Sequence, residues 1–268
     1  MGNITFVYPR RTRPLSITGE TCALSCSHCN GHYLKHMKNF CSDSEVTSNV
    51  VKSYLISGGC DSEGAVPLKD HLDILKNLSK KYNVIAHTGL IKEEDVPLIS
   101  PYIHAASFNF IGEDSTIREV YNLKKTALDF IQSYVALRKE VRTFPHITIG
   151  IHRGEVKGEY HALDELSKLG AEALVFNVFI PTPGTEYENA KPPSLNDIQD
   201  VLSYAKKKMN KTPLYLGCMR PSGRFREQLD EMCVSMGMDR IVMPSKGAQG
   251  LAESLGLEIL TSEECCII

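Results

Sequence analysis

Three cysteines lie close together in the segment Cys22–Cys29, which reads Cys-Ala-Leu-Ser-Cys-Ser-His-Cys. Their C-x3-C-x2-C spacing follows the run Leu15–Thr18, which alternates apolar and polar residues. Thiolates are soft ligands, and thiolates this close together can hold iron or zinc. Because three local ligands do not complete a four-cysteine shell, one iron of a [4Fe-4S] cluster would stay open to a small molecule.

Two other interpretations of the three cysteines remain. One is a zinc site, and the other is a set of unrelated buried thiols. Zinc knuckles usually bring a second ligand pair at a similarly short spacing. The sequence contains no second C-x2-C pair, so the deciding context is the fold that surrounds the loop.

The composition is that of an ordinary globular protein. The chain has 268 residues, of which 42% are hydrophobic, and a formal charge of -2 that gives no electrostatic case for a nucleic-acid partner. No apolar run approaches the roughly 18 residues of a membrane span, and the first residues lack the shape of a signal peptide. Nine cysteines in such a chain favour cofactor ligation in a reducing cytoplasm.

Short β-type runs alternate with helical runs along the whole sequence. The expected strands cover 15–19, 53–57, 83–87, 103–110, 146–151, 173–179, 213–216 and 240–243, after a short leading strand at 3–8. The expected helices lie somewhere within 43–52 and at 68–81, 92–99, 124–139, 158–169, 194–209, 222–236 and 246–255. Gly170 fits the glycine that ends a helix, and Ser194 or Asn196 fits a helix cap.

This alternation predicts an α/β fold with parallel strands and helical crossovers. Eight such units fit one TIM-type (β/α)8 barrel, complete or nearly complete, which occupies 1–268 as a single domain. An open three-quarter barrel with a separate tail is the alternative. In the (β/α)8 barrel, the tail, 257–268, is expected to run back to the mouth and close the active site.

Residues that can do chemistry gather where strands end, which is where barrels of this kind place their sites. Ser107 and Asn109 alternate on one strand and therefore share a face. Arg220 could clamp a carboxylate through two hydrogen bonds, although a surface arginine is the alternative. The other polar or turn-forming residues at these ends are Gly58, Gly59, Arg153, Glu155, Asn177 and Pro181–Thr185.

Four further cysteines could meet at the same end of the barrel. Cys60 and Cys218 follow two of the expected strands, and Cys265 and Cys266 lie in the tail. The ten residues from Leu257 to Cys266 can span roughly 30 Å when extended, enough to return to the mouth. The hypothesis is an auxiliary iron–sulfur cluster on these four residues, and unrelated thiols are the alternative.

With these residues in place, the chain from Cys22 to the tail resembles the biotin-synthase-like branch of the radical S-adenosylmethionine (SAM) superfamily. The resemblance is carried by Cys22-x3-Cys26-x2-Cys29, Ser57–Cys60, Gly217–Pro221 and Glu264–Cys266. Together these motifs look most similar to one component of the archaeal-type two-protein lipoyl synthases.

The resemblance implies roles for particular residues. Cys22, Cys26 and Cys29 would hold the [4Fe-4S] cluster that binds SAM, and His28 would lie near the adenine. The residues that would contact the rest of SAM are Gly58, Gly59, Ser107, Asn109, Arg153, Glu155 and Pro181. Cys60 stands where the family often has an acidic residue, so the side-chain contact usual at that point is in doubt.

The resemblance also implies a reaction. SAM would be cleaved reductively to methionine and a 5′-deoxyadenosyl radical, and sulfur would be inserted into an octanoyl chain carried by a lipoyl carrier protein. A sister radical SAM protein and an electron donor such as ferredoxin would be partners. The alternatives are a related radical SAM enzyme that acts on a free small molecule, and a non-catalytic iron–sulfur or zinc module that cleaves no SAM.

Overall fold

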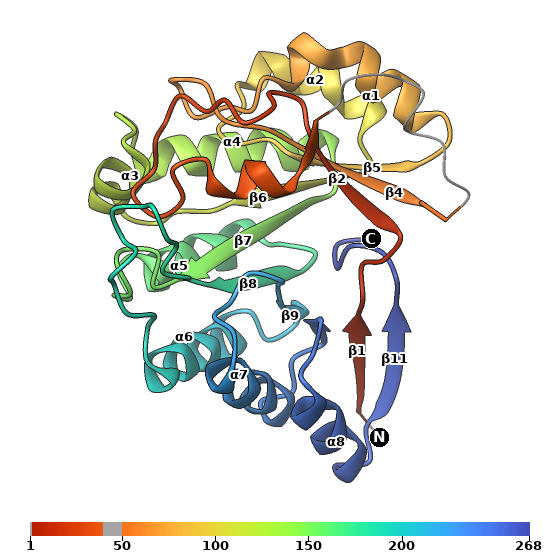
Figure 1. Cartoon of the computed structure of the whole chain (residues 1–268), viewed down its shortest axis with the longest axis vertical. Coiled ribbons are helices and arrows are strands. Elements are labelled where there is room, and N and C mark those ends of the chain that lie inside the picture. The colour runs from red at the N-terminus through yellow and green to blue at the C-terminus, as the bar shows by residue number, and fades with distance from the viewer. Residues whose placement is uncertain (1, 40–49) are drawn as a thin grey trace.

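The computed structural model describes residues 2–39 and 50–268. Its eleven strands form one curved sheet in which every pairing is parallel (Figure 1). The strands are β1 (Asn3–Val7), β2 (Thr12–Ser16), β3 (Lys38–Asn39), β4 (Ser53–Ser57), β5 (Asn83–His87), β6 (Ala105–Asn109), β7 (Thr143–Ile149), β8 (Leu174–Val178), β9 (Leu214–Leu216), β10 (Arg240–Val242) and β11 (Glu258–Ser262).

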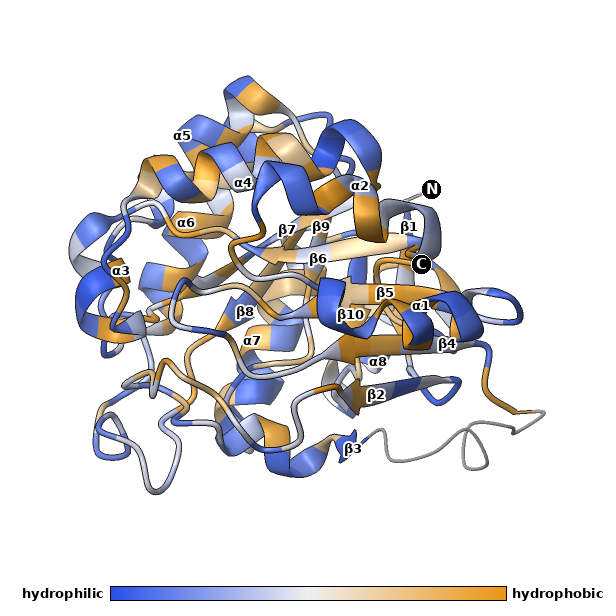
Figure 2. Cartoon of the chain, turned by 90° about the horizontal axis from the view of Figure 1, so that it is seen from above, coloured by the Kyte–Doolittle hydropathy of each residue, from blue (hydrophilic) through white to orange (hydrophobic). Residues whose placement is uncertain are grey.

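Helices lie on the outer side of the curve (Figure 1). The α-helices are α1 (Leu72–Ser79), α2 (Val96–Ile99), α3 (Asp114–Tyr121), α4 (Ala127–Glu140), α5 (Glu159–Leu169), α6 (Leu195–Lys208), α7 (Arg224–Ser235) and α8 (Lys246–Ser254). Apolar and polar residues alternate in patches along each helix (Figure 2), as expected of a helix with one buried face. None of the helices in the described part of the chain is both long and apolar enough to cross a membrane.

Most of the expected elements are present. The leading strand, all eight following strands and the helices from 68 onward appear within a few residues of their predicted positions. Ser194 caps α6 and shares a capping box with Asp197, and Gly170 ends α5. The sequence pattern missed α3, β3 and β11, and the helix expected within 43–52 lies largely outside the described residues.

The hydrogen-bonding order of the sheet is linear rather than circular. It runs β11-β1-β10-β9-β8-β7-β6-β5-β4-β2-β3. The consecutive strands β1 and β2 join different parts of the sheet, because β1 pairs with β10 and β11 while β2 pairs with β4 and β3. The observed fold is therefore a curled, all-parallel, barrel-like sheet, and the hydrogen-bond ladders do not close it.

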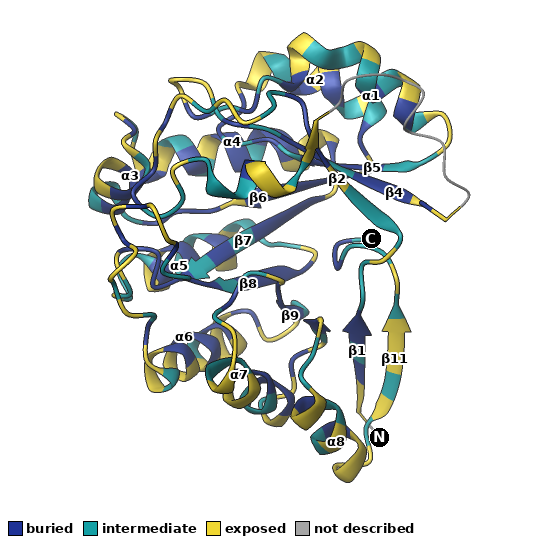
Figure 3. Cartoon of the chain, in the orientation of Figure 1, coloured by how far each residue is buried: buried dark blue, intermediate teal, exposed yellow. Residues whose placement is uncertain are grey.

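The end of the chain packs inside the curve of the sheet, which we call the lumen. Strand β11 runs parallel to β1 at the exposed edge (Figure 3), and the residues after it turn inward. Cys266 and Ile267 are buried there, with 6% and 1% of their surface exposed. They belong to one apolar cluster with Val7, Ile85, Ala105, Phe144, Ala173, Val175, Tyr215 and Val242.

The expectation that the tail returns to the barrel mouth stays a prediction. Ala105 is the first residue of β6, and Arg240, which donates to the carbonyls of Cys266 and Ile268, is the first residue of β10. Val7 and Val242 of the same cluster are instead the last residues of β1 and β10, so the tail lies across the lumen. Ile267 and Cys266 complete an apolar layer of the lumen there, which we call the tail floor.

Candidate cofactor site

The cysteine loop leaves the carboxyl end of β2 and is held in place by backbone hydrogen bonds to three other segments. Ala23 N donates to the carbonyl oxygen of Cys60, which follows β4, over 2.8 Å. Ser27 N donates to the carbonyl of Val120 in α3 over 2.8 Å, and Tyr187 N donates to the carbonyl of Ser27 over 3.1 Å. These bonds fix the loop at the edge of the sheet where parallel α/β folds carry their sites.

Two residues that flank Cys26 and Cys29 adopt left-handed backbone conformations. Ser25 has a φ of 45° and Asn30 a φ of 41°, a region that residues other than glycine enter uncommonly. Asn122 at the end of α3 donates to the carbonyl of Ser25 over 3.0 Å. The surroundings therefore hold the loop in a conformation that its own sequence does not favour.

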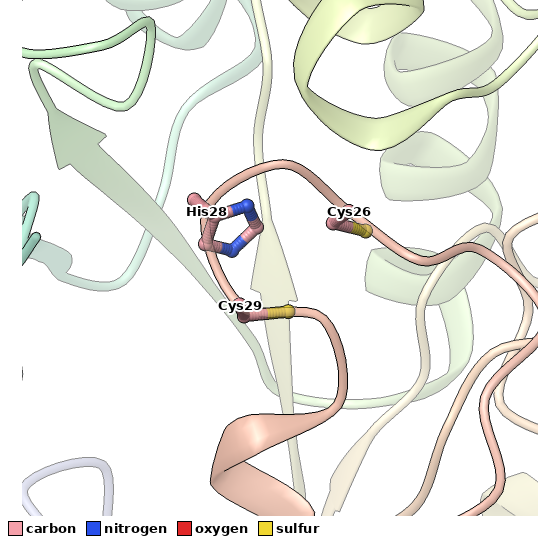
Figure 4. Close-up of side chains that lie close together, drawn as sticks. All are labelled: Cys26, His28 and Cys29. Atoms are coloured by element: carbon pink, nitrogen blue, oxygen red, sulfur yellow. The ribbon is translucent and has the colours of Figure 1, made fainter. Parts of the chain in front are cut away.

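Cys26, His28 and Cys29 lie close together on the cysteine loop (Figure 4). Their candidate ligand atoms all lie within 4.8 Å of one another, and no other three such side chains in residues 2–39 and 50–268 meet this closely. The hydrogen bond between the two thiols raises the pKa of Cys26 far above its ordinary value and lowers the pKa of Cys29 to about 4. His28 lowers the pKa of Cys29 further. The pair therefore readily presents a thiolate, the form that binds metal.

Cys22 and Cys60 lie beside this group. Cys22 is outside the 4.8 Å cluster, but a thiolate there contributes to the raised pKa of both Cys26 and Cys60. Burial is the main cause that raises the pKa of Cys60, to about 12. Cys60 thus lies against the cysteine loop, where the charges that act on it are those of Cys22, Asp61 and Cys29. Its place in a cluster with Cys218 and the tail stays a prediction.

The glycine pair after β4 packs against the cysteine loop. A Cβ atom on Gly59 would lie 2.5 Å from Cα of Cys22, and one on Gly58 would lie 3.0 Å from the side chain of Thr18. Gly59 N also donates to Thr18 Oγ1 over 2.7 Å. These glycines allow the two loops to touch, a structural role beside the SAM contact that was expected of them.

The loop suits an iron–sulfur cluster by the chemistry of its donors. Three thiols come from one short segment, and soft thiolates are the usual ligands of such clusters. The Nδ1 atom of His28 is buried and has no hydrogen-bond partner among the described residues, as expected where a bound group would supply one. Cys26, His28 and Cys29 would also suit zinc.

A residue that the sequence pattern missed stands beside this group. The His28 ring lies 5.3 Å from the ring of Tyr121, between centroids. Burial, followed by the charges of Cys26, Cys29 and Cys60, raises the pKa of Tyr121 well above its ordinary value. Tyr121 ends α3, whose amphipathic pattern (Thr116, Ile117 and Val120 are buried) was the signal that could have revealed it.

The residues expected to contact SAM lie in two places: some face the lumen, and others lie in the turns at the carboxyl ends of the strands. Ser107 and Asn109 share the lumen face of β6, but Ser107 is buried and bonded to His146 while Asn109 is exposed. Arg153 is exposed and lies over the Tyr187 ring at 5.9 Å. Glu155 bridges back to His152 in the turn after β7.

Pro181 opens the loop after β8. The Oγ1 atom of Thr182, the next residue, lies 3.1 Å from the hydroxyl oxygen of Tyr33. Tyr33 follows Gly31 by two residues, just past the cysteine loop. The loop of Pro181 and the cysteine loop are thus neighbours at the same end of the sheet.

Arg220 does not reach a substrate position. The residue is 3% exposed, and its side chain forms a two-pronged ion pair with Asp230, with N–O distances of 2.7 and 3.1 Å. It also donates to the carbonyls of Gly217 and Val242. With these donors taken, the guanidinium ties the ends of β9 and β10 to α7, and the expected carboxylate clamp is not supported.

Cys218 and the two tail cysteines lie near one another. A thiolate at Cys265 contributes, after burial, to the raised pKa of Cys218, and the thiols of Cys265 and Cys266 share a hydrogen bond. Cys265 N donates to Thr12 Oγ1 over 2.8 Å. The charges of Cys218 and Cys265 thus interact, but the sulfur atoms of Cys218, Cys265 and Cys266 do not gather as closely as the ligand atoms of Cys26, His28 and Cys29. The auxiliary cluster stays a prediction.

Comparisons with protein-family models and with curated proteins give no match. Solved structures do match over most of the chain. Methylornithine synthase (PylB) superposes with a TM-score of 0.64 at 10% identity, over 96% of this chain and 83% of that one. The FeFe-hydrogenase maturase HydG from Carboxydothermus hydrogenoformans has a TM-score of 0.61 at 14% identity, over 90% and 58%.

A third match is Streptococcus suis SuiB, whose structure contains S-adenosylmethionine. It has a TM-score of 0.52 at 13% identity, over 90% of this chain and 58% of that one. At these identities the likeness concerns the fold alone. The chain therefore has the curled, parallel α/β fold of these three enzymes, with a cysteine loop at the carboxyl ends of its strands.

Proposed function

We propose that this protein is a radical SAM enzyme. The observation that carries the proposal is the convergence of Cys26, His28 and Cys29, with Cys22 beside them, at the carboxyl ends of parallel strands. Cys22, Cys26 and Cys29 would hold a [4Fe-4S] cluster. Such a cluster would supply one electron to bound SAM, which would be cleaved to methionine and a 5′-deoxyadenosyl radical able to take hydrogen from an unactivated carbon.

The chain's own residues suit this chemistry in two ways. The left-handed Ser25 and Asn30 and the contacts of Ser27 fix the cysteine loop, so the ligands need little reorganisation. The apolar layer made by Cys266 and Ile267 fills part of the lumen, and an apolar layer keeps water away from a reactive species.

The test is anaerobic reconstitution with iron and sulfide, reduction, and addition of SAM, with 5′-deoxyadenosine as the product measured. We expect product from the wild type and none from Cys26→Ala. The matched control is Cys233→Ala, which removes a fully buried thiol of the helix layer and should keep both iron and activity. Stoichiometric zinc without 5′-deoxyadenosine would instead favour the non-catalytic metal module.

A second, finer proposal is sulfur insertion of the lipoyl synthase type. The nearness of Cys218 to the hydrogen-bonded thiols of Cys265 and Cys266 supports it, since these thiols could hold an auxiliary cluster that donates sulfur. The substrate would be an octanoyl chain on a lipoyl carrier protein, with a sister radical SAM protein and a ferredoxin-like donor as partners.

An octanoyl-lysine peptide tests this finer proposal by mass spectrometry. Sulfur should appear on the acyl chain with the wild type and disappear with Cys265→Ala, while 5′-deoxyadenosine still forms. Iron content should fall by one cluster per chain in the same variant. An unchanged iron content would remove the auxiliary cluster and leave the radical enzyme.

A further inference from the structure

The lumen changes from apolar to polar above the tail floor. Side chains two residues apart on a strand point to the same face. Leu55, Ile85, Ala105, Phe144 and Val175 pack in or against the floor cluster. The next lumen-facing residues along the same strands are Ser57, His87, Ser107, His146 and Asn177. We call these five residues the polar belt.

The members of the belt bond to one another in pairs. Ser57 Oγ lies 3.4 Å from His87 Nδ1, and Ser107 Oγ lies 3.2 Å from His146 Nδ1 and 3.3 Å from His146 Nε2. The two imidazole rings are 6.5 Å apart between centroids. His146 Nδ1 also lies 3.0 Å from the carbonyl oxygen of Phe144, an arrangement in which Nδ1 donates and Nε2 is left as an acceptor.

Two polar atoms of the belt are left without a protein partner. Within residues 2–39 and 50–268, neither His87 Nε2 nor Asn177 Nδ2 makes a hydrogen bond. Both residues are partly buried. A Cβ atom on Gly217 would lie 2.2 Å from Asn177 Oδ1. The glycine therefore leaves the space that Asn177 occupies in the lumen.

The belt is polar but uncharged at neutral pH. Burial lowers the pKa of His87 to about 4, and burial with the charge of His87 lowers the pKa of His146 to about 3. The arginines nearest to the lumen are engaged elsewhere, since Arg220 pairs with Asp230 and Arg240 holds the tail carbonyls. Asn177 Nδ2 is thus a neutral hydrogen-bond donor, and His87 Nε2 is one when Ser57 Oγ donates to His87 Nδ1.

We propose that the polar belt holds the end of the substrate that reaches deepest into the lumen, and that this end carries a carbonyl or carboxylate oxygen. The inference rests on the proposed function in placing the substrate in the lumen. An apolar end, such as the methyl terminus of an octanoyl chain, would leave His87 and Asn177 desolvated and unpaired. A substrate with a polar deep end and an octanoyl substrate therefore predict opposite results for the binding of polar and apolar probes at the belt.

The test records the ring 15N NMR signals of His87 and His146 in the reconstituted protein. Acetamide and acetate serve as uncharged and charged polar probes, and xenon serves as the apolar probe. We expect acetamide or acetate to shift the His87 Nε2 signal saturably and xenon to leave it unchanged. Acetamide alone would assign a carbonyl group, and acetate alone a carboxylate.

Two variants make the result specific, with the His146 signal as the reporter. His87→Gln keeps a side-chain donor and should bind the polar probe within a few-fold of the wild type. His87→Leu should weaken the binding of the polar probe at least tenfold. Binding of xenon in place of both polar probes, no response to any probe, or an unchanged affinity in His87→Leu would overturn the inference. None of these results involves SAM cleavage, so the 5′-deoxyadenosine assay judges the proposed function separately.

Discussion

Arg220 shows at the residue scale how a side chain suited to catalysis serves the fold instead. It and Asp230 are both fully enclosed, with 0% side-chain exposure, and their ion pair joins a strand end to α7. Removing one member of a buried pair leaves the other charge without compensation, which costs about 3–5 kcal/mol. Arg220→Ala should therefore lower the free energy of unfolding in urea by that amount.

The control for Arg220 is Arg142, whose ion pair with Glu172 is about half exposed. Its side chain and that of Glu172 are 48% and 50% exposed, and exposed pairs contribute about 0–1 kcal/mol. Arg142→Ala should change little. If Arg220→Ala kept its stability and lost only substrate affinity, the carboxylate clamp would return as the better interpretation.

The lowered pKa values of His87 and His146 predict that the folded protein loses stability in acid. Their folded pKa values of about 4 and 3 lie below the value of about 6.5 for an unfolded histidine. Below pH 6.5 the unfolded state therefore binds more protons than the folded state. Stability should fall as the pH drops from about 6.5 toward 4, and level off below the folded values.

The measurement is urea unfolding of the wild type and of the double variant His87→Asn, His146→Asn across this pH range. The wild-type curve should be the steeper one, because asparagine does not titrate. Equal slopes for the two proteins would show that the imidazoles are not held neutral in the folded state.

At the scale of elements, the prediction concerns Gly59. This residue lies in the loop after β4, which contacts the cysteine loop. A methyl group there would lie 2.0 Å from the carbonyl oxygen of Thr21 and 2.6 Å from Cys22 Cβ. Gly59→Ala should displace the cysteine loop, and iron bound after reconstitution should fall several-fold.

Gly250 in α8 is the matched control for this substitution, because nothing lies within 4 Å of a Cβ atom added there. In a helix, alanine is favoured over glycine by roughly 0.5–1 kcal/mol. Gly250→Ala should therefore keep its iron and become slightly more stable. Full iron binding by Gly59→Ala would mean that the two loops tolerate separation.

At the scale of the whole molecule, the tail is the feature that matters. It places the last six residues inside the curve of the sheet, among residues of distant strands. Ile267 is 1% exposed among residues from β1, β5, β6, β7 and β10. Ile267→Ala should destabilise the protein by about 2–5 kcal/mol through lost burial and the cavity left behind.

Leu260 on the edge strand β11 is 43% exposed and provides the control for Ile267. Leu260→Ala should cost much less in a thermal or urea unfolding experiment. Equal losses for the two variants would contradict an interior position for the tail.

The sequence by itself determined the periodic elements and the local metal-binding chemistry. Parallel strands and helical crossovers follow from alternating apolar runs, and the ligand spacing of Cys22, Cys26 and Cys29 is a property of eight consecutive residues. Each depends on interactions between near neighbours, which the order of residues states directly.

Only the tertiary structure decided which distant residues meet. The sequence could not show that Cys60 lies against the cysteine loop, that Arg220 pairs with Asp230, or that the tail packs in the lumen. These outcomes depend on strand register and on the burial of apolar residues such as Ile267 in a layer shared by many strands. Such packing is a property of the assembled sheet, and it appears in no single stretch of the chain.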